Sequence, residues 1–218
     1  MDHTRHIGVF NAANYSVALI GAGGIGTLTG ITLAKMGVGS LSIYDDDQVD
    51  PINLATQFYR LSDVGKDKVS ALSEAISEYA SLVSQTQNFK VDQSTVLESA
   101  HIVISAVDRI DARQDIWEAV QQSNPLWYLD ARMSVEHFQL FVVDMSNRDW
   151  YTAALSDQDD NLIPNEPCTS KATIYTACIA AGQVGAAVRR IITGAQIPGV
   201  ISHDIFRNVL IEEKMQSR

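Results

Sequence analysis

The stretch SVALIGAGGIGTLTGITLAKMGVGSLSIYDDD, residues 16–47, decides the fold of this 218-residue chain. Its first apolar run, residues 16–20, ends at a glycine-rich turn, as a buried strand does. Residues 27–36 then have helical character and stop at a glycine, and residues 40–44 form a second apolar run. A strand, a glycine loop, a helix and a second strand form a βαβ unit, which starts a parallel sheet.

Beyond residue 47, apolar runs and amphipathic segments continue to alternate along the chain. Strands that alternate with helices favour a parallel sheet with helices on both faces. We therefore expect an α/β fold over residues 1–218, a single Rossmann-like, doubly wound domain with a mostly parallel sheet and an antiparallel C-terminal part. Further strands are expected at residues 87–91, 101–106, 127–131, 137–143 and 204–211, and further helices at residues 69–84, 111–121 and 169–192.

Charge and cysteine content exclude several classes of protein. The chain has 16 lysine and arginine residues against 26 aspartate and glutamate residues, a net charge of −10, which argues against binding to nucleic acid or to an anionic membrane. Its two cysteines, Cys168 and Cys178, exclude a disulfide scaffold and a four-cysteine zinc site. The uncharged segments 15–34 and 172–188 contain glycine and polar residues, so we interpret them as buried core rather than membrane spans. The first residues lack the apolar segment of a signal peptide, and the expected location is the cytoplasm.

The glycine loop predicts a nucleotide site. Gly21, Gly23 and Gly26 form the pattern G-x-G-x-x-G between a strand and a helix, with Gly24 inside it. Such a loop lets a phosphate approach the main chain, and the helix N-terminus offers it unpaired N–H groups. Asp45 ends the next strand, where a carboxylate accepts hydrogen bonds from ribose hydroxyls. The alternative is a loop that only packs the helix against the sheet, and this unit by itself would favour NAD.

The segment that follows changes this interpretation. DDDQVDPINLATQFYRLSDVGKDK, residues 45–68, together with GAGGIG and the later ISAVDRIDAR, resembles the ThiF/MoeB/HesA family, bacterial relatives of the ubiquitin-activating enzymes. The resemblance covers residues 17–113 and continues more loosely through the region of Cys168. The matching positions are Gly21 to Gly26, Gly37 to Gly39, Asp45, Asp47, Val49, Asn53, Leu54, Gln57, Gly65, Lys68, Asp108 and Arg113.

The resemblance implies an activity and assigns roles to residues. In that family the fold binds ATP and Mg²⁺ and adenylates the C-terminal glycine carboxylate of a ubiquitin-like or sulfur-carrier protein. By resemblance, Asp45 holds the ribose, Lys68 contacts the phosphates and Asp108 carries the Mg²⁺. The nucleotide-binding set implied in this chain is Gly21, Gly23, Gly24, Gly26, Asp45, Asp47, Asn53, Gln57 and Lys68.

The chemistry of adenylation suits these residue types. A terminal carboxylate is ionised at neutral pH and needs no general base, so the difficulty lies in bringing an anion to a polyanion. Catalysis then depends on positioning and on cations, for which Lys68, Arg60, Arg113 and a magnesium ion on Asp108 are candidates. Two plainer interpretations stay open: Lys68 as a solvated lysine at a helix start, and Asp108 as a helix cap.

One position departs from the family pattern. The family's N-L-x-R-Q is N-L-A-T-Q here, so Thr56 stands where an arginine usually contacts phosphate. A hydroxyl provides one hydrogen bond and no charge, whereas arginine provides a charged fork. We expect Arg60, four residues further on, to act as the substitute. The paired C-x-x-C motifs of many relatives are absent, so no metal other than Mg²⁺ is implied.

Two further assignments concern the partner subunit and acyl transfer. Family members are often homodimers in which an N-terminal arginine reaches the ATP of the partner subunit, which makes Arg5 a candidate; the alternative is a flexible basic residue near a terminus. Cys168 ends a polar crossover loop, about residues 144–168, and precedes a helix that would favour its thiolate. It is a candidate acceptor of the activated acyl group or else a structural thiol, and we expect Cys178 to lie in the core.

Three other functions compete with adenylation of a small protein. The acceptor could instead be a modified tRNA nucleoside or a peptide, although the acidic balance argues against tRNA. Thr56 would also suit a non-catalytic, ATP-binding partner subunit. An NAD oxidoreductase is the third alternative, and no residue after Gln57 supports it.

Overall fold

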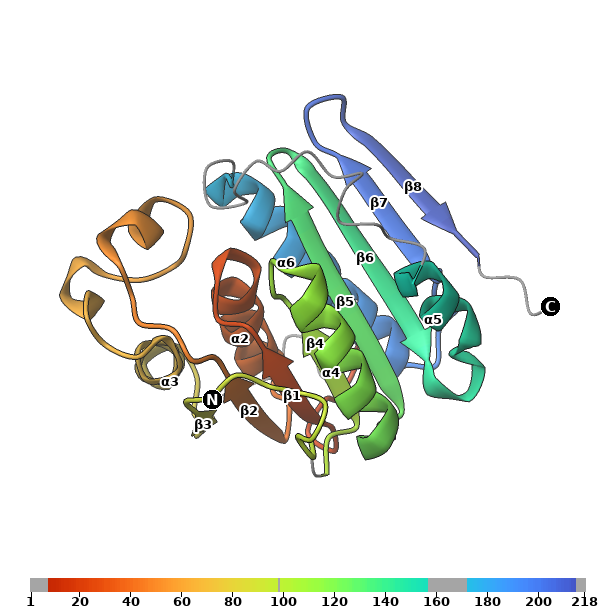
Figure 1. Ribbon diagram of the computed structural model, residues 1–218, viewed down its shortest axis with the longest axis horizontal. Helices are drawn as coiled ribbons and strands as arrows, with labels where there is room; N and C mark the ends of the chain where they lie inside the picture. The colour runs from red at the N-terminus through yellow and green to blue at the C-terminus, as the bar shows by residue number, and fades with distance from the viewer. Residues whose placement is uncertain (1–7, 98, 157–171, 215–218) are drawn as a thin grey trace.

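Eight strands form one mixed sheet with the order β3-β2-β1-β4-β5-β6-β7-β8 (Figure 1). The computed structural model describes residues 8–97, 99–156 and 172–214. The strands from β3 to β5 are parallel, and those from β5 to β8 are antiparallel, which confirms the predicted fold class. The strands are β1 (Ser16–Ile20), β2 (Ser40–Tyr44), β3 (Gln85–Gln87), β4 (Ile102–Ser105), β5 (Trp127–Ser134), β6 (His137–Asp144), β7 (Val200–Asp204) and β8 (Val209–Glu213).

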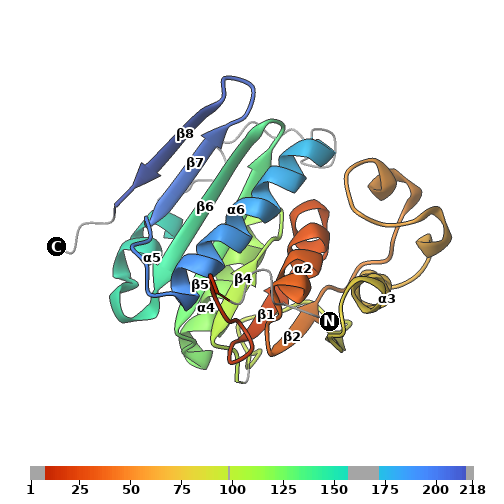
Figure 2. The same cartoon turned by 180° about the vertical axis from the view of Figure 1, so that it is seen from behind.

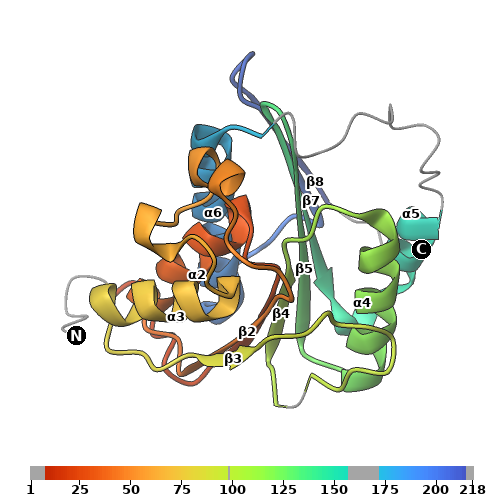
Figure 3. The same cartoon turned by 60° about the vertical axis from the view of Figure 1, so that its left-hand side comes forward.

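Helices cover both faces of the sheet. Helices α2, α3 and α6 lie on one face and α4 and α5 on the other (Figure 2, Figure 3). An apolar cluster fills the space under each layer, with Leu33, Leu72 and Val184 in one and Trp117 and Tyr151 in the other, and burial of these side chains drives folding. The helices are α2 (Gly24–Met36), α3 (Lys68–Tyr79), α4 (Ile110–Ser123), α5 (Asp149–Ser156) and α6 (Ile174–Ile192), and the 3₁₀ turns are η1 (Pro51–Ala55), η2 (Leu61–Asp63) and η3 (Met145–Asn147).

The turn between β1 and α2 needs glycine for reasons of space. A Cβ atom on Gly26 would lie 2.0 Å from the carbonyl oxygen of Gly21, so a larger residue does not fit unless the main chain moves. Gly21 has a φ of +95°, a left-handed conformation that glycine adopts at little cost. Helix α2 begins at Gly24, with Gly23 as its N-cap. This start is three residues earlier than the sequence predicts, so Gly24 and Gly26 belong to the helix.

The segment expected to be an irregular crossover loop, residues 144–168, is partly helical. Its described part contains η3 and the two-turn helix α5, so that part of the prediction is wrong. Tyr151 and Leu155 lie one helical turn apart and are both buried, and Tyr151 packs edge-on against Trp117. A single buried pair in a polar segment is too short a pattern to reveal a helix in the sequence.

The prediction of a single C-terminal strand at residues 204–211 is also wrong. Two antiparallel strands, β7 and β8, stand there, joined by a turn at residues 205–208. Asn208 has a φ of +53°, a left-handed conformation that asparagine tolerates in turns. Elsewhere the boundaries shift: β3 lies at Gln85–Gln87 instead of residues 87–91, α3 ends at Tyr79 instead of residue 84, and the described part of the last helix begins at Ile174.

Candidate active site

A cleft of about 790 Å³ opens where the parallel strands β1, β2, β4 and β5 end. Ligands of open α/β sheets bind at this edge, outside the carboxyl ends of the strands. The cleft brings together most of the residues singled out in the sequence, although separate segments carry them. Those that line it are Gly21, Gly23, Gly24, Asp45, Asp47, Asn53, Thr56, Gln57, Lys68 and Asp108, and Gly26 lies buried behind the loop.

Asp45 is held by the main chain on two sides. Its Oδ2 accepts the N–H of Ala22 at 2.7 Å, and its Oδ1 accepts the N–H of Asp47 at 2.9 Å. Burial raises the pKa of Asp45, and the charge of Lys68 and these two hydrogen bonds only partly offset this rise. A carboxylate oxygen accepts more than one hydrogen bond, so Asp45 is fixed in place and can still receive hydroxyl donors from a ligand.

Lys68 is a buried cation at the first residue of α3. Its Nζ lies 2.6 Å from Oδ2 of Asp47, and the residue is 6% exposed. The main chain adds a second contact, because the N–H of Lys68 donates to the carbonyl oxygen of Asp47 at 2.9 Å. The alternative of a solvated lysine at a helix start is therefore wrong. Lys68 is a pre-positioned positive charge on the wall of the cleft.

Asp108 lies just after β4, exposed on the cleft. It does not cap α4, because the N-cap of that helix is Arg109, and the cap makes no side-chain hydrogen bond. The main chain before Asp108 is held from behind: the guanidinium of Arg113 donates to the carbonyl oxygen of Val107. Arg113 is 3% exposed and pairs with Asp130, so it supports the loop that carries Asp108 and does not present a free charge to the cleft.

The glycine loop and Gln57 offer unsatisfied polar groups to a ligand. The first turn of α2 has no side-chain cap, so its N–H groups are available to a phosphate. Gln57 Oε1 is buried without a hydrogen-bond partner among the described residues. Asn53 is used within its own turn, where its Oδ1 accepts the N–H of Asp50 at 2.9 Å. These features, with Asp45 and Lys68, fit a nucleotide with its phosphates at the loop.

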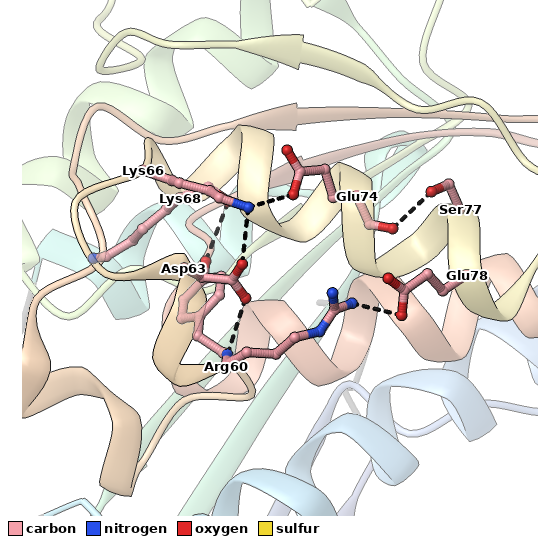
Figure 4. Close-up of polar contacts among 8 residues, drawn as sticks. Arg60, Asp63, Lys66, Lys68, Glu74, Ser77 and Glu78 are labelled. Carbon is pink, nitrogen blue, oxygen red and sulfur yellow. Dashed lines mark hydrogen bonds and ion pairs between the residues drawn. The ribbon is translucent and has the colours of Figure 1, made fainter.

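The structure does not bring Arg60 to the cleft. Arg60 Nη2 pairs with Glu78 Oε2 of α3 at 2.7 Å (Figure 4), and Arg60 is absent from the described residues that line the cleft. The turn that contains it is locked by Asp63, whose carboxylate accepts the main-chain N–H of Arg60 at 2.9 Å and the ammonium of Lys66 at 3.1 Å. This position does not support the expectation that Arg60 acts in place of the arginine that relatives have where Thr56 stands.

Another set of cleft residues carried no recognisable sequence motif. Arg132 of β5 lines the cleft, donates from Nε to Asp130 Oδ2 at 2.6 Å and lies over the ring of Phe141 at 4.4 Å. Asp130 is fully buried and also accepts the hydroxyl of Tyr151 at 2.7 Å. Arg132 is therefore paired with the buried carboxylate of Asp130. The antiparallel register of β5 and β6 places Gln139 opposite Arg132, so the two side chains form one wall of the cleft.

The remaining candidates fall outside the described residues or differ from expectation. Arg5 and Cys168 lie outside the described residues. Cys178 is exposed on α6, so the prediction that it lies in the core is wrong. An apolar helix sequence does not show which of its sides faces the sheet, and the neighbouring Thr176 and Ala177 take the buried positions.

The fold and the cleft define an α/β protein of the nucleotide-binding class. The sequence model of the ThiF family matches residues 6–216. The chain belongs to the ThiF family, which confirms the resemblance that residues 17–113 indicate.

The individual relatives and solved structures that the chain resembles share less than a third of their residues with it. Ubiquitin-like modifier-activating enzyme 5 of Drosophila mojavensis is 29% identical over 129 residues, which cover 52% of this chain and 32% of that protein. The chain therefore spans about a third of the length of the curated relatives it matches. Among solved structures, PaaA has a TM-score of 0.75 and 21% identity, with 94% of this chain and 74% of that chain covered. E. coli MccB, solved with AMPCPP and MccA, has a TM-score of 0.76 and 18% identity, with 95% and 66% covered.

Hydropathy adds one observation. None of the helices in the described ranges combines the length and the apolar character that a membrane span requires.

Proposed function

We propose that this protein is an ATP- and Mg²⁺-dependent adenylyltransferase that activates the C-terminal glycine carboxylate of a small ubiquitin-like or sulfur-carrier protein. The observation that carries the proposal is that Asp45, Lys68 and Asp108 line one cleft together with the glycine loop. Family membership supports it, and the relative from Drosophila mojavensis is named for activating a ubiquitin-like modifier. The expected location is the cytoplasm.

In the proposed reaction, a carboxylate oxygen of the acceptor attacks the α-phosphorus of ATP. A bond forms between that oxygen and phosphorus while the bond to the pyrophosphate oxygen breaks, so the products are an acyl adenylate and pyrophosphate. Asp45 orients the ribose, and Lys68 neutralises phosphate charge from its buried position. Asp108 would hold the magnesium ion, which supplies further positive charge to the phosphate oxygens.

Acyl transfer and assembly extend the proposal. We propose Cys168 as the acceptor of the acyl group after adenylation: its sulfur would bond to the acyl carbon, and AMP would leave. We also propose a homodimer in which Arg5 reaches the ATP of the partner subunit. The homodimer would add a cation to a cleft in which Thr56 stands where relatives have arginine.

A non-catalytic ATP-binding subunit is the second candidate function. Thr56 lacks a charge, and Arg60 is held by Glu78 away from the cleft. Because neither residue supplies a charge to the cleft, less positive charge is available near the reacting phosphate. Under this alternative the protein binds ATP but releases no pyrophosphate with any acceptor.

ATP–pyrophosphate exchange tests the proposal. The purified protein is incubated with ATP, Mg²⁺, labelled pyrophosphate and small glycine-ending proteins encoded near it. Exchange that depends on one of them establishes adenylation and names the acceptor. ATP binding without exchange would support the non-catalytic subunit or a non-protein acceptor.

Two variants assign the steps. We expect Asp108→Ala to lower exchange by about 100-fold or more with the fold intact, since it removes the ligand of the charge-neutralising ion. Asp111→Ala, in the first turn of α4, is the matched control. Cys168→Ala should leave exchange unchanged and remove only a later covalent adduct; loss of exchange in that variant would contradict the proposed order of steps.

A further inference from the structure

The segment of residues 56–59 lies directly on the glycine loop through three contacts. The carbonyl oxygen of Thr56 would be 3.0 Å from a Cβ on Gly24, so the absent side chain of that glycine makes room for it. The N–H of Phe58 donates to Thr27 Oγ1 at 3.2 Å. The hydroxyl of Tyr59 donates to the carbonyl oxygen of Ala22 at 2.6 Å. The close fit at Gly24 therefore serves the packing of the protein's own chain.

Residue 22 is consequently held at both of its main-chain polar groups. Its N–H donates to Asp45 Oδ2 at 2.7 Å, and its carbonyl oxygen accepts the hydroxyl of Tyr59. The same hydroxyl lies 3.4 Å from the carbonyl oxygen of Lys68. One phenol thus touches the glycine loop and the first residue of α3, and Ala22 connects it to the ribose-binding carboxylate.

Tyr59 acts from behind these groups. It is absent from the described residues that line the cleft, and its ring is partly buried against the apolar cluster under α2, α3 and α6. Burial, and then the negative charges of Asp45 and Asp63, raise the pKa of Tyr59 well above its usual value. The hydroxyl therefore stays protonated and remains a donor across the physiological pH range.

We propose that Tyr59 is a positioning residue for the nucleotide, acting through the main chain of Ala22. Its hydroxyl holds the Ala22–Gly23 peptide group, and the N–H of the preceding Gly21–Ala22 peptide group holds the Asp45 carboxylate, so residue 22 links Tyr59 to Asp45 and to the N-terminal edge of α2. The proposal rests on the proposed function, in that the cleft takes ATP. A phenylalanine at residue 59 keeps the ring packing and removes only the hydrogen bond, so the loop would bind the nucleotide less well without losing its fold.

Calorimetric titration of ATP into the wild-type protein and Tyr59→Phe is the direct test. We expect the dissociation constant to rise about fivefold, the effect of losing one hydrogen bond that orders a binding loop. Tyr175→Phe is the matched control, because that hydroxyl contacts Glu136 at the exposed start of α6. In exchange assays, KM for ATP should rise by a similar factor while kcat changes less than about twofold.

A second measurement separates positioning from a merely structural role. Amide hydrogen exchange at Ala22 in the nucleotide-free protein should be faster in Tyr59→Phe than in the wild type, because the main chain of residue 22 is then held only through its N–H on Asp45 and opens more often. Unchanged ATP affinity together with unchanged exchange at Ala22 would overturn the proposal, and so would a lower unfolding midpoint with unchanged affinity. Failure of the wild-type protein to bind ATP would instead overturn the proposed function.

Discussion

The parallel and the antiparallel halves of the sheet line the same cleft in different ways. In the parallel half, the groups that face a ligand stand at strand ends and are fixed by main-chain hydrogen bonds, as Asp45 is by the N–H groups of Ala22 and Asp47. In the antiparallel half, long side chains rise from within β5 and β6, and the buried carboxylate of Asp130 fixes the side chain of Arg132. The first wall depends on main-chain donors at the strand ends and the second on a buried ionic network.

This difference separates two tasks under the proposed function. Phosphates and ribose suit a rigid wall of main-chain donors, because that wall needs no reorganisation when the ligand arrives. Arg132 and Gln139 line the cleft from β5 and β6, outside the glycine loop. We therefore expect changes in the parallel half to alter nucleotide binding and changes in the antiparallel half to alter stability and use of the acceptor.

The largest effect is expected at the buried carboxylate of the antiparallel half. Asp130→Asn leaves the buried guanidinium of Arg113 and the half-buried guanidinium of Arg132 without their counter-charge, and we expect a loss of about 3–5 kcal/mol in the free energy of unfolding. Urea denaturation measures it. Glu212→Gln breaks an exposed pair with Arg190 and should cost less than about 1 kcal/mol. Similar losses in the two variants would show that burial of the network contributes nothing.

A glycine pair tests the steric argument for the parallel half. Gly26→Ala puts a Cβ 2.0 Å from a main-chain oxygen, and we expect a loss of about 2–3 kcal/mol in stability. Gly182, within α6, has open space around its Cβ direction among the described residues, so Gly182→Ala should add about 0.5–1 kcal/mol through helix propensity. Thermal unfolding of both variants checks the two signs, and a neutral Gly26→Ala would contradict the account of the turn.

Removal of the buried cation should weaken nucleotide binding alone. Lys68→Ala takes away the charge next to Asp47, and we expect the dissociation constant of ATP to rise about tenfold or more, as for a lost hydrogen bond to a charged group. Lys35→Ala is the control, since that ammonium lies over the ring of Tyr79 at 5.1 Å. If Lys68→Ala binds ATP as tightly as the wild type does, the assignment of Lys68 to the phosphates is wrong.

The smallest effect concerns pH. Because burial raises the pKa of Asp45, its ionised form is lost at a higher pH than for an ordinary aspartate, about 3.9. The ribose hydroxyls need the ionised form as acceptor, so ATP affinity should weaken as pH falls through this raised pKa, by less than about threefold between pH 7.5 and 5.5. Titrations over this range, compared with Asp45→Asn, test it. An equal pH dependence in that variant would assign the effect to another group.

Much of the parallel half was predictable because its signals are local. The run before Gly21, the glycine pattern and the position of Asp45 at a strand end need only neighbouring residues. The antiparallel half was predicted less well. Helix α5 was missed because a single buried pair is its only sequence signal. The β7–β8 hairpin was missed because its only signal is one turn at Asn208. Cys178 was misplaced because an apolar helix sequence does not show which of its sides faces solvent.

The sequence by itself determined the fold class, the family and most of the cleft residues of the parallel half, since these depend on short-range patterns and on residue types at fixed spacings. Only the tertiary structure decided how the charged groups are used. It paired Arg60 with Glu78, buried Lys68 beside Asp47, turned Arg113 and Arg132 toward Asp130 and placed Tyr59 behind the glycine loop. The physical reason is that a charged or hydroxyl side chain takes the partner that packing brings within about 3 Å, and the sequence does not contain that distance.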